Sequence, residues 1–246
     1  MPQKPKHYEL IIAQLAAQKD VSVATSMQRF FPTPIHALGV PAKPIDELAT
    51  RFHKENPQQS VEEVIALSNW TIVHHQYHEE VLLAFALLNK LIGKAQGSEV
   101  LLLARHWLEH HVSNWAQVDS LAMKTLNRYL IKNLNEVMTL DVWLESNSPW
   151  CRRAAYVVWL KFVHQKIGKQ TYQLPVDFIY AQCDRGLSDG DDYVQKAIGW
   201  LLKTLSKTQP DSVIDYLVTN KNKIRKSTWR YAIEKLSPTQ IASMSL

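Results

Sequence analysis

The chain has 246 residues, 46% of them hydrophobic and 21% charged, a mixture typical of soluble globular proteins. Two cysteines exclude a disulfide scaffold and a four-cysteine zinc site. No apolar run approaches the ~20 residues that cross a bilayer, and the N-terminus leads into no apolar signal segment. We therefore expect a cytoplasmic protein without a membrane partner, forming a single domain over residues 1–246.

The positive charge is concentrated near the C-terminus. Residues 203–235 hold eight basic and three acidic residues, which accounts for the whole net charge of +5. A localised basic segment favours an anionic partner such as nucleic acid or a membrane surface. The other interpretation is a solvated face without a partner.

Helical patterning runs along the chain, because apolar residues recur at intervals of three and four rather than two. Start signals agree: Ser60 precedes Glu63 as in a capping box, Ser148 precedes Pro149, and Pro210 opens a helix. No run predicts a strand. The predicted helices are His7–Lys19, Pro44–His53, Ser60–Leu67, Tyr77–Ile92, Ser98–His111, Asn114–Leu130, Leu134–Glu145, Pro149–Ile167, Pro175–Cys183, Asp191–Ser206, Asp211–Val218 and Ser227–Lys235. Short connections between them indicate an all-α stack of helical pairs.

Trp200 interrupts the polar face of its helix. At about 100° per residue, Lys196, Trp200, Lys203 and Lys207 fall within about 60° of arc, opposite the apolar stripe. Tryptophan is seldom left in water. Either the ring packs under a neighbouring repeat, or it is an aromatic platform in a cationic strip that contacts nucleic acid.

Asp119 is the second irregularity, since it shares a helix face with Trp115 and lies beside apolar positions. A carboxylate there costs free energy unless it is paired or functional. It is therefore either a structural acid that bridges a neighbouring helix or a reactive group.

Arg152 and Arg153 occupy the first turn of a predicted helix, where the helix dipole disfavours cations. An anion held by the helix N-terminus and an arginine would explain the placement. Alternatively, each arginine pairs with an acid across a helix junction.

Other candidates carry weaker signals. His74/His78 and His106/His110 have the spacing of metal ligands, yet no HExxH motif occurs, and exposed polar faces explain them better. We therefore expect no metal and no cofactor, since nucleotide-binding loops and a nucleophile elbow are missing as well. Cys151 and Cys183 are expected in the core, and the Phe30-Phe31 pair is either an aromatic lid or core.

These irregular sites coincide with motifs of a known family. Val194–Trp200 resembles the QKAIGW motif of AlkD-type DNA alkylation repair proteins, which are HEAT-like-repeat DNA glycosylases. Asn114–Asp119 resembles the family's WDxVD segment, and Pro149–Ala155 its WxxRAAI segment. Leu38–Val40, after Phe30-Phe31, resembles the FLGI stretch, and Ser227–Leu236 the SxREAI close of the last repeat.

The resemblance implies a right-handed solenoid of HEAT/ARM-like helical pairs with a concave DNA-binding face. It implies that Asp119 is the catalytic carboxylate. The residues that would bind the lesion or the DNA are Trp115, Trp200, Arg153, Lys196, Lys203, Lys207, Phe30 and Arg230. Lys203 replaces the family's frequent arginine, and Phe30 or Phe31 falls where the family can place a tyrosine.

The implied activity is hydrolysis of the N-glycosidic bond of cationic N3- or N7-alkylated purines in duplex DNA by a monomeric, monofunctional glycosylase. Two alternatives remain open. One is a non-catalytic relative that binds distorted or branched DNA, and the other is a HEAT scaffold for acidic proteins.

Overall fold

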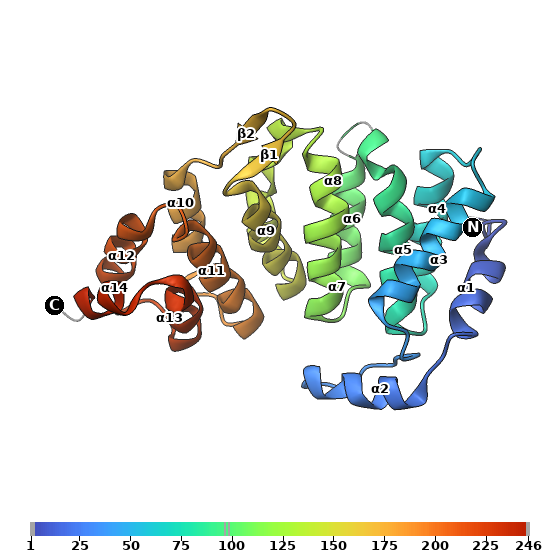
Figure 1. The fold of residues 1–246 in the computed structure, drawn as a ribbon, viewed down its shortest axis with the longest axis horizontal. Coiled ribbons are helices and arrows are strands. Elements are labelled where there is room, and N and C mark those ends of the chain that lie inside the picture. Colours follow the sequence, from blue (N-terminus) through green and yellow to red (C-terminus); the bar gives the residue numbers. More distant parts are fainter. Residues whose placement is uncertain (1–2, 96, 98, 245–246) are drawn as a thin grey trace. The chain divides into compact units, whose positions relative to one another are not determined.

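The computed structural model describes residues 3–95, 97 and 99–244, and the chain divides after Asn133 into two compact units. The first, residues 1–133, is built from helices (Figure 1). They are α1 (Tyr8–Ala16), α2 (Val21–Met27), α3 (Ala42–Glu55), α4 (Val61–His74), α5 (His78–Leu91), α6 (Glu99–His110), α7 (Trp115–Ser120), a π-helical segment (Leu121–Leu126) and α8 (Asn127–Leu130), with 3-10 turns at Gln28–Phe30 and Ile92–Lys94.

The second unit, residues 134–246, continues the helical pattern. Its elements are 3-10 turns at Leu134–Glu136 and Met138–Glu145, α9 (Pro149–Phe162), β1 (Gln165–Ile167), β2 (Gln170–Tyr172), α10 (Val176–Gly186), α11 (Asp192–Leu205), α12 (Pro210–Thr219), α13 (Lys226–Ala232), a 3-10 turn at Ile233–Lys235 and α14 (Pro238–Ser243). The predicted all-α class and its stacked helical pairs are confirmed.

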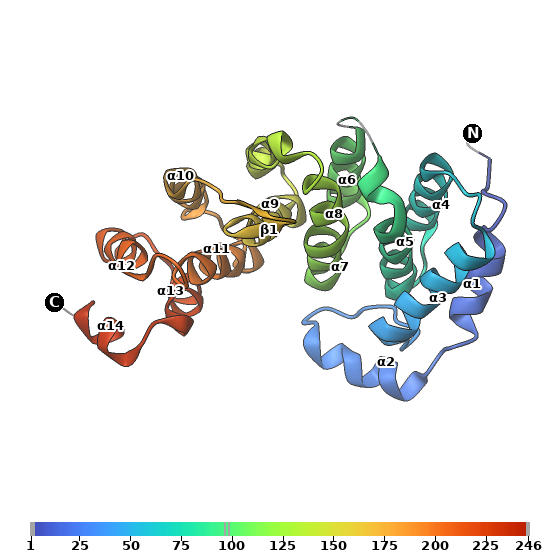
Figure 2. The same cartoon turned by 45° about the horizontal axis from the view of Figure 1, so that its top comes forward.

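One central helix organises each unit. In the first, α5 packs against α3, α4 and the π-helical segment, and it lies between α3 and α7 in both views (Figure 1, Figure 2). In the second, α11 packs between α9 and α13. Helix α5 buries most of its residues, as packing on several sides requires, whereas α11 keeps a polar face opposite its apolar stripe.

The predicted start signals form as expected. Ser60 and Glu63 make a reciprocal capping box at the start of α4. The Ser148 hydroxyl accepts the Cys151 N–H at 3.5 Å, with Pro149 in the first turn of α9. Pro210 begins α12. Because these signals satisfy N–H groups that have no partner inside the helix, they act locally and are readable from sequence.

Three element predictions need correction. Residues 165–172 form a two-stranded antiparallel hairpin whose turn holds Gly168 at φ 61°, where sequence analysis expected no strand. Residues 134–145 form 3-10 turns instead of one α-helix. Within this segment, the Val137 carbonyl accepts the Trp159 indole Nε1–H at 2.9 Å. The predicted helix at 114–130 contains the π-helical segment. Strands of three residues and local changes of helical pitch leave too little periodicity to recognise.

A buried carboxylate fixes the N-terminal segment to α5. Glu79 is fully buried, and its oxygens accept the backbone N–H groups of Leu38, Gly39 and Val40 at 2.7–3.2 Å. Gly39 has φ +83°, and a Cβ atom there would lie 1.9 Å from the Asp20 carbonyl oxygen. The loop therefore requires glycine, which explains the Leu38–Val40 motif structurally.

Among the described residues, no helix has the length and apolar character needed to cross a membrane.

Candidate nucleic-acid interface

Trp115 and Asp119 are held one turn apart on α7. The helix begins after Asn114, whose side-chain Oδ1 accepts the Gln117 N–H at 3.1 Å. Both candidate side chains are half-buried, while Val118, between them in sequence, is fully buried. The predicted shared helix face is therefore present, with its apolar neighbours turned into the core.

The sequence leaves open whether the Phe30-Phe31 pair is an aromatic lid or part of the core, and the structure shows that the two residues differ. Phe31 is buried and stacks on Trp115, with ring centroids 5.7 Å apart and planes inclined by 23°. Phe30 is 59% exposed, and its backbone carbonyl accepts the Trp115 indole N–H at 3.3 Å. Phe30 therefore presents its ring to solvent while its backbone carbonyl holds the Trp115 indole, and Phe31 belongs to the core.

His78 supports this arrangement from the start of α5. Its Nδ1 lies 3.2 Å from the Asn114 Nδ2, and its ring meets Phe31 edge to face at 5.6 Å. Burial lowers the pKa of His78, Glu79 opposes this, and His75 adds to it. The ring is 5% exposed, so the neutral imidazole is favoured. The sequence favours an exposed polar face for His78 over a metal site, and the burial of this residue corrects that prediction.

In the second unit, most of the QKAIGW motif serves packing. The buried Gln195 amide donates to the carbonyls of Gly186 and Asp189, and its Oε1 accepts the Thr228 hydroxyl at 2.6 Å. A Cβ atom on Gly199 would lie 2.5 Å from the Thr228 carbonyl oxygen. Gln195 and Gly199 therefore hold α11 against α13 at close range.

Trp200 and two of the three predicted lysines share one side of α11. Trp200 is half-buried, and the Lys203 ammonium lies 5.9 Å from its ring centroid and 5.4 Å from that of Tyr231. Lys203 also pairs with Glu234 at 3.0 Å. Lys196 pairs with Asp192 at 2.7 Å, which raises the Lys196 pKa.

Lys207 lies in the turn after α11, which ends at Leu205. The helical angle that placed Lys207 on the face of Trp200 therefore does not apply, although the side chain is exposed. Arg230 is an exposed residue of α13. A helix ends where its last carbonyls find other partners, and angular arithmetic does not extend past that point.

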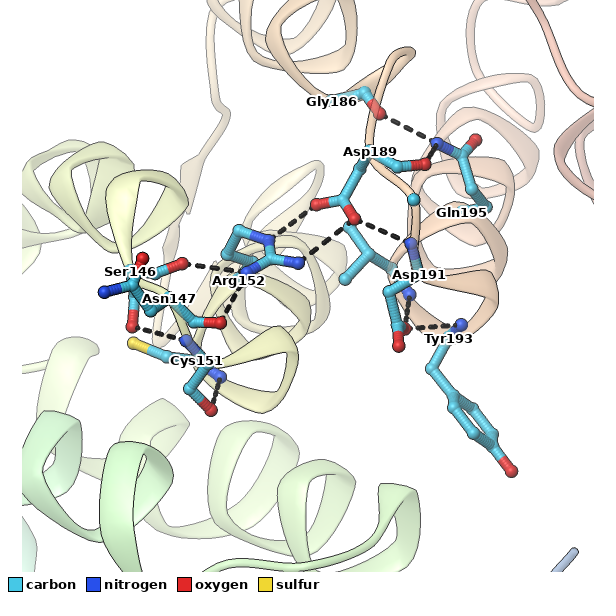
Figure 3. A network of polar contacts seen from close by, with 12 residues as sticks. Ser146, Asn147, Cys151, Arg152, Gly186, Asp189, Asp191, Tyr193 and Gln195 are labelled. Carbon is cyan, nitrogen blue, oxygen red and sulfur yellow. Dashed lines mark hydrogen bonds and ion pairs between the residues drawn. The ribbon is translucent and has the colours of Figure 1, made fainter.

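The two arginines of α9 both make contacts within the protein, and Figure 3 shows those of Arg152. Arg152 makes a two-pronged ion pair with Asp189 at 2.6 and 3.1 Å, and Asp189 raises the Arg152 pKa. Arg153 is 5% exposed and donates to the Tyr193 carbonyl at 2.7 Å. Arg152 therefore pairs with an acid across a helix junction, as one of the two interpretations predicted. Arg153 instead connects α9 to the start of α11.

The structure also adds two half-exposed aromatic residues that sequence analysis did not select. Trp150 and Tyr193 have ring centroids 5.3 Å apart, and the Lys196 ammonium lies 5.2 Å from the Tyr193 ring centroid. Tyr193 is three residues before Lys196 and seven before Trp200, a spacing that repeats one helix face and that the angular analysis could have included.

The candidate residues thus gather in two sets, one in each unit. Phe30, Trp115 and Asp119 belong to the first unit. The second unit contains Arg153, Lys196, Trp200, Lys203, Lys207 and Arg230. Cys151 and Cys183 are buried, as predicted, and burial raises the pKa of the Cys183 thiol. In the part of the chain that the structure describes, no three His, Cys, Asp or Glu side chains have a geometry that could hold a metal ion.

A comparison with family models matches residues 11–236 to the DNA alkylation repair enzymes. The chain belongs to this family. The match spans the N-terminal loop, α7, α9 and the whole of α11, and so includes every element that carries a candidate site residue. No curated protein matches the sequence.

Two solved structures share the fold. A predicted DNA alkylation repair enzyme from Enterococcus faecalis is 20% identical, with a TM-score of 0.74 over 90% of this chain and 98% of that one. AlkD2 from Streptococcus mutans is also 20% identical, with a TM-score of 0.59 over 88% of this chain and 98% of that one. At this identity, the likeness establishes the fold alone.

The close approach of α11 and α13 makes Gly199→Ala destabilising. Alanine ordinarily favours a helix over glycine by about 1 kcal/mol. Here its methyl group would meet the Thr228 carbonyl and the Tyr231 Cβ, so we expect the free energy of unfolding to fall by about 1–3 kcal/mol. Urea denaturation measures this change. The matched control is Gly190→Ala, where no atom lies within 4 Å of the added Cβ, and an equal midpoint for the two variants would contradict the prediction.

Proposed function

We propose that this DNA alkylation repair protein is a glycosylase that hydrolyses the N-glycosidic bond of cationic N3- and N7-alkylpurines in duplex DNA. One observation carries the proposal. Trp115 and Asp119 stand on one helix face, half-buried, and the Trp115 indole N–H is hydrogen-bonded to the backbone carbonyl of the exposed Phe30. An aromatic surface next to a carboxylate suits a sugar that becomes positively charged during the reaction.

The reaction needs little help at the base. An N3- or N7-alkylpurine carries a positive charge, so it leaves C1′ as a neutral molecule that takes the bonding electron pair with it. The sugar is left as an oxocarbenium-like cation. The Asp119 carboxylate would stabilise that charge. It would also orient the water whose oxygen bonds to C1′ and accept the proton that the water loses.

The tryptophans would contact the DNA, each from its own unit. Trp115 would lie against the deoxyribose, exclude bulk water there and present its negative ring face to the cation, and Trp200 would add an aromatic surface to the DNA contact of the second unit. Trp115 is already oriented by Phe31 and by the Phe30 carbonyl. Trp200 is accompanied by Lys203. DNA binding would need little reorganisation of the two indole rings, because both are held in place before DNA binds.

The cations of the second unit would hold phosphates. In this proposal Lys203, Lys207 and Arg230 contact the DNA backbone, which positions the duplex without reading its sequence. Lys196, Lys203 and the buried Arg153 are already bonded within the protein. Their contribution requires that DNA compete with Asp192, with Glu234 and with the Tyr193 carbonyl.

The proposal requires one copy of the chain and no metal or cofactor. Hydrolysis by water rather than by an amine makes the enzyme monofunctional. Lys203, the lysine beside Trp200, pairs with Glu234, which lowers the pKa of that carboxyl group. An ammonium that is held in an ion pair with a carboxylate is not a nucleophile.

Asp119→Asn tests the role of the carboxylate. The change is nearly isosteric, so folding and DNA binding should persist, whereas release of methylated bases should fall by about 10²–10³-fold. Mass spectrometry of bases released from methylated duplex DNA measures this rate. Asp215→Asn, an exposed site on α12, is the matched control. Release by Asp119→Asn at the parental rate contradicts the assignment, and a parent that binds duplex but releases nothing indicates the non-catalytic alternative.

Triple replacement of Lys196, Lys203 and Lys207 by alanine tests the binding of phosphates by this surface. The slope of log affinity against log salt concentration should become shallower by up to about 0.9 for each phosphate that is no longer neutralised. Duplex-binding titrations at several salt concentrations measure this slope. Removal of Lys4, Lys43 and Lys54 lowers the net charge equally and should leave the slope unchanged. An identical change in both triple variants would mean that net charge, and not this surface, binds DNA.

Substrate charge tests the mechanism. No acidic residue is assigned to protonate a leaving base, so only a base that departs as a neutral molecule should be released. We expect release of 7-methylguanine or 3-methyladenine from methylated duplex and none of uracil or hypoxanthine from matched duplexes, measured as free base. Efficient uracil excision would require a general acid and would contradict the mechanism.

A further inference from the structure

We infer that His78 is a positioning residue that sets the orientation of Trp115 through Asn114 and Phe31, and that protonation of its ring disturbs this orientation. The role of Trp115 rests on the proposed function. The geometry around His78 stands independently of it, because every contact involved lies within the first unit.

The hydrogen bonds determine the state of the His78 ring. Asn114 Oδ1 accepts the Gln117 N–H, so the other end of the Asn114 amide, Nδ2, faces His78 Nδ1 and donates to it at 3.2 Å. The imidazole Nδ1 must then be an acceptor without a proton. A protonated His78 would carry N–H groups on both ring nitrogens and would set a donor against the donor of Asn114.

His78 contacts both residues that support Trp115, namely Asn114 and Phe31. Asn114 is the residue before Trp115 and caps α7, and Phe31 stacks on the indole while its edge meets the His78 ring. The His78 backbone N–H also donates to the His36 carbonyl at 2.7 Å, in the loop that carries Phe31. Movement of this ring is therefore transmitted to Trp115 through the cap and through the stack.

The surroundings of His78 favour the neutral form of its ring. The titratable groups around it come from α5 and from two loops. His78 is the first residue of α5, where the helix dipole disfavours a cation. On α5, the Glu79 carboxylate binds three backbone N–H groups, and Glu80 accepts the Gln76 N–H. From the loop between α4 and α5, His75 donates from Nδ1 to the Ile72 carbonyl. The loop before α3 contributes His36, and α7 contributes the uncharged Asn114.

Protons can reach the ring from solvent. A cavity of about 270 Å³ is lined by His36, His75, His78, Asn114 and Gln117, among others. Because the pKa of His78 is lowered by burial, the unfolded chain binds a proton more readily than the native protein does. The Asn114 bond is complete above the ordinary histidine pKa of about 6.5 and is lost as pH falls through the lower, native value.

The test follows Trp115 and base release together between pH 5 and pH 8. In the parent, the indole N–H resonance of Trp115, assigned by Trp115→Phe, should shift on acidification with a midpoint below 6.5, and release of 7-methylguanine should fall several-fold with the same midpoint. His78→Asn places an amide oxygen near the position of Nδ1, where it accepts from Asn114 and does not titrate. Both pH dependences should disappear in this variant, with neutral-pH release within about threefold of the parent.

A second variant covers the case in which His78→Asn fails to fold. Asn114→Asp keeps an oxygen for the Gln117 cap and gives the protonated imidazole an acceptor, so the midpoint of the Trp115 resonance should rise. An unmoved Trp115 resonance in the parent, or the same midpoint in the parent and the variants, overturns the inference. If no base is released at any pH but the resonance behaves as described, the proposed function fails and the positioning role of His78 stands.

Discussion

A buried backbone N–H group needs an acceptor, and leaving one unpaired costs about 1–3 kcal/mol. In each unit, a carboxylate accepts backbone N–H groups of a loop and links that loop to a helix. In the first unit, Glu79 accepts three N–H groups of the loop around Gly39. In the second, Asp189 accepts the Asp191 N–H while it pairs with Arg152. These bonds hold the loop before α3 and the start of α11.

The candidate site residues stand directly beside such anchors. Trp115 follows the Asn114 cap, and Tyr193 follows the Asp191 cap, whose carboxylate accepts the Tyr193 N–H at 2.8 Å. A ring at the first turn of a capped helix is held by a short chain of hydrogen bonds rather than by burial. It can therefore stay half-exposed and still be well oriented, which is what contact with a nucleic acid requires.

The family motifs accordingly combine two kinds of residue. In the QKAIGW motif, Gln195 and Gly199 are buried and serve the packing of α11, while Lys196 and Trp200 remain at the surface. In the segment around α9, Arg152 and Arg153 connect helices rather than project into solvent. A family motif therefore contains residues needed for packing as well as residues available for function. The two kinds can be distinguished only when the burial of each residue is known.

The sequence by itself determined the all-α class, the helix starts at Ser60 and Ser148 and the face shared by Trp115 and Asp119, because caps and helical periodicity depend on neighbours a few residues apart. It also located the family motifs. Only the tertiary structure decided that Phe31 is core while Phe30 is exposed, that Arg152 pairs with Asp189, that α11 ends before Lys207 and that His78 supports Trp115. Most of these outcomes depend on partners many residues away in the sequence, and long-range packing selects such partners without leaving a local pattern.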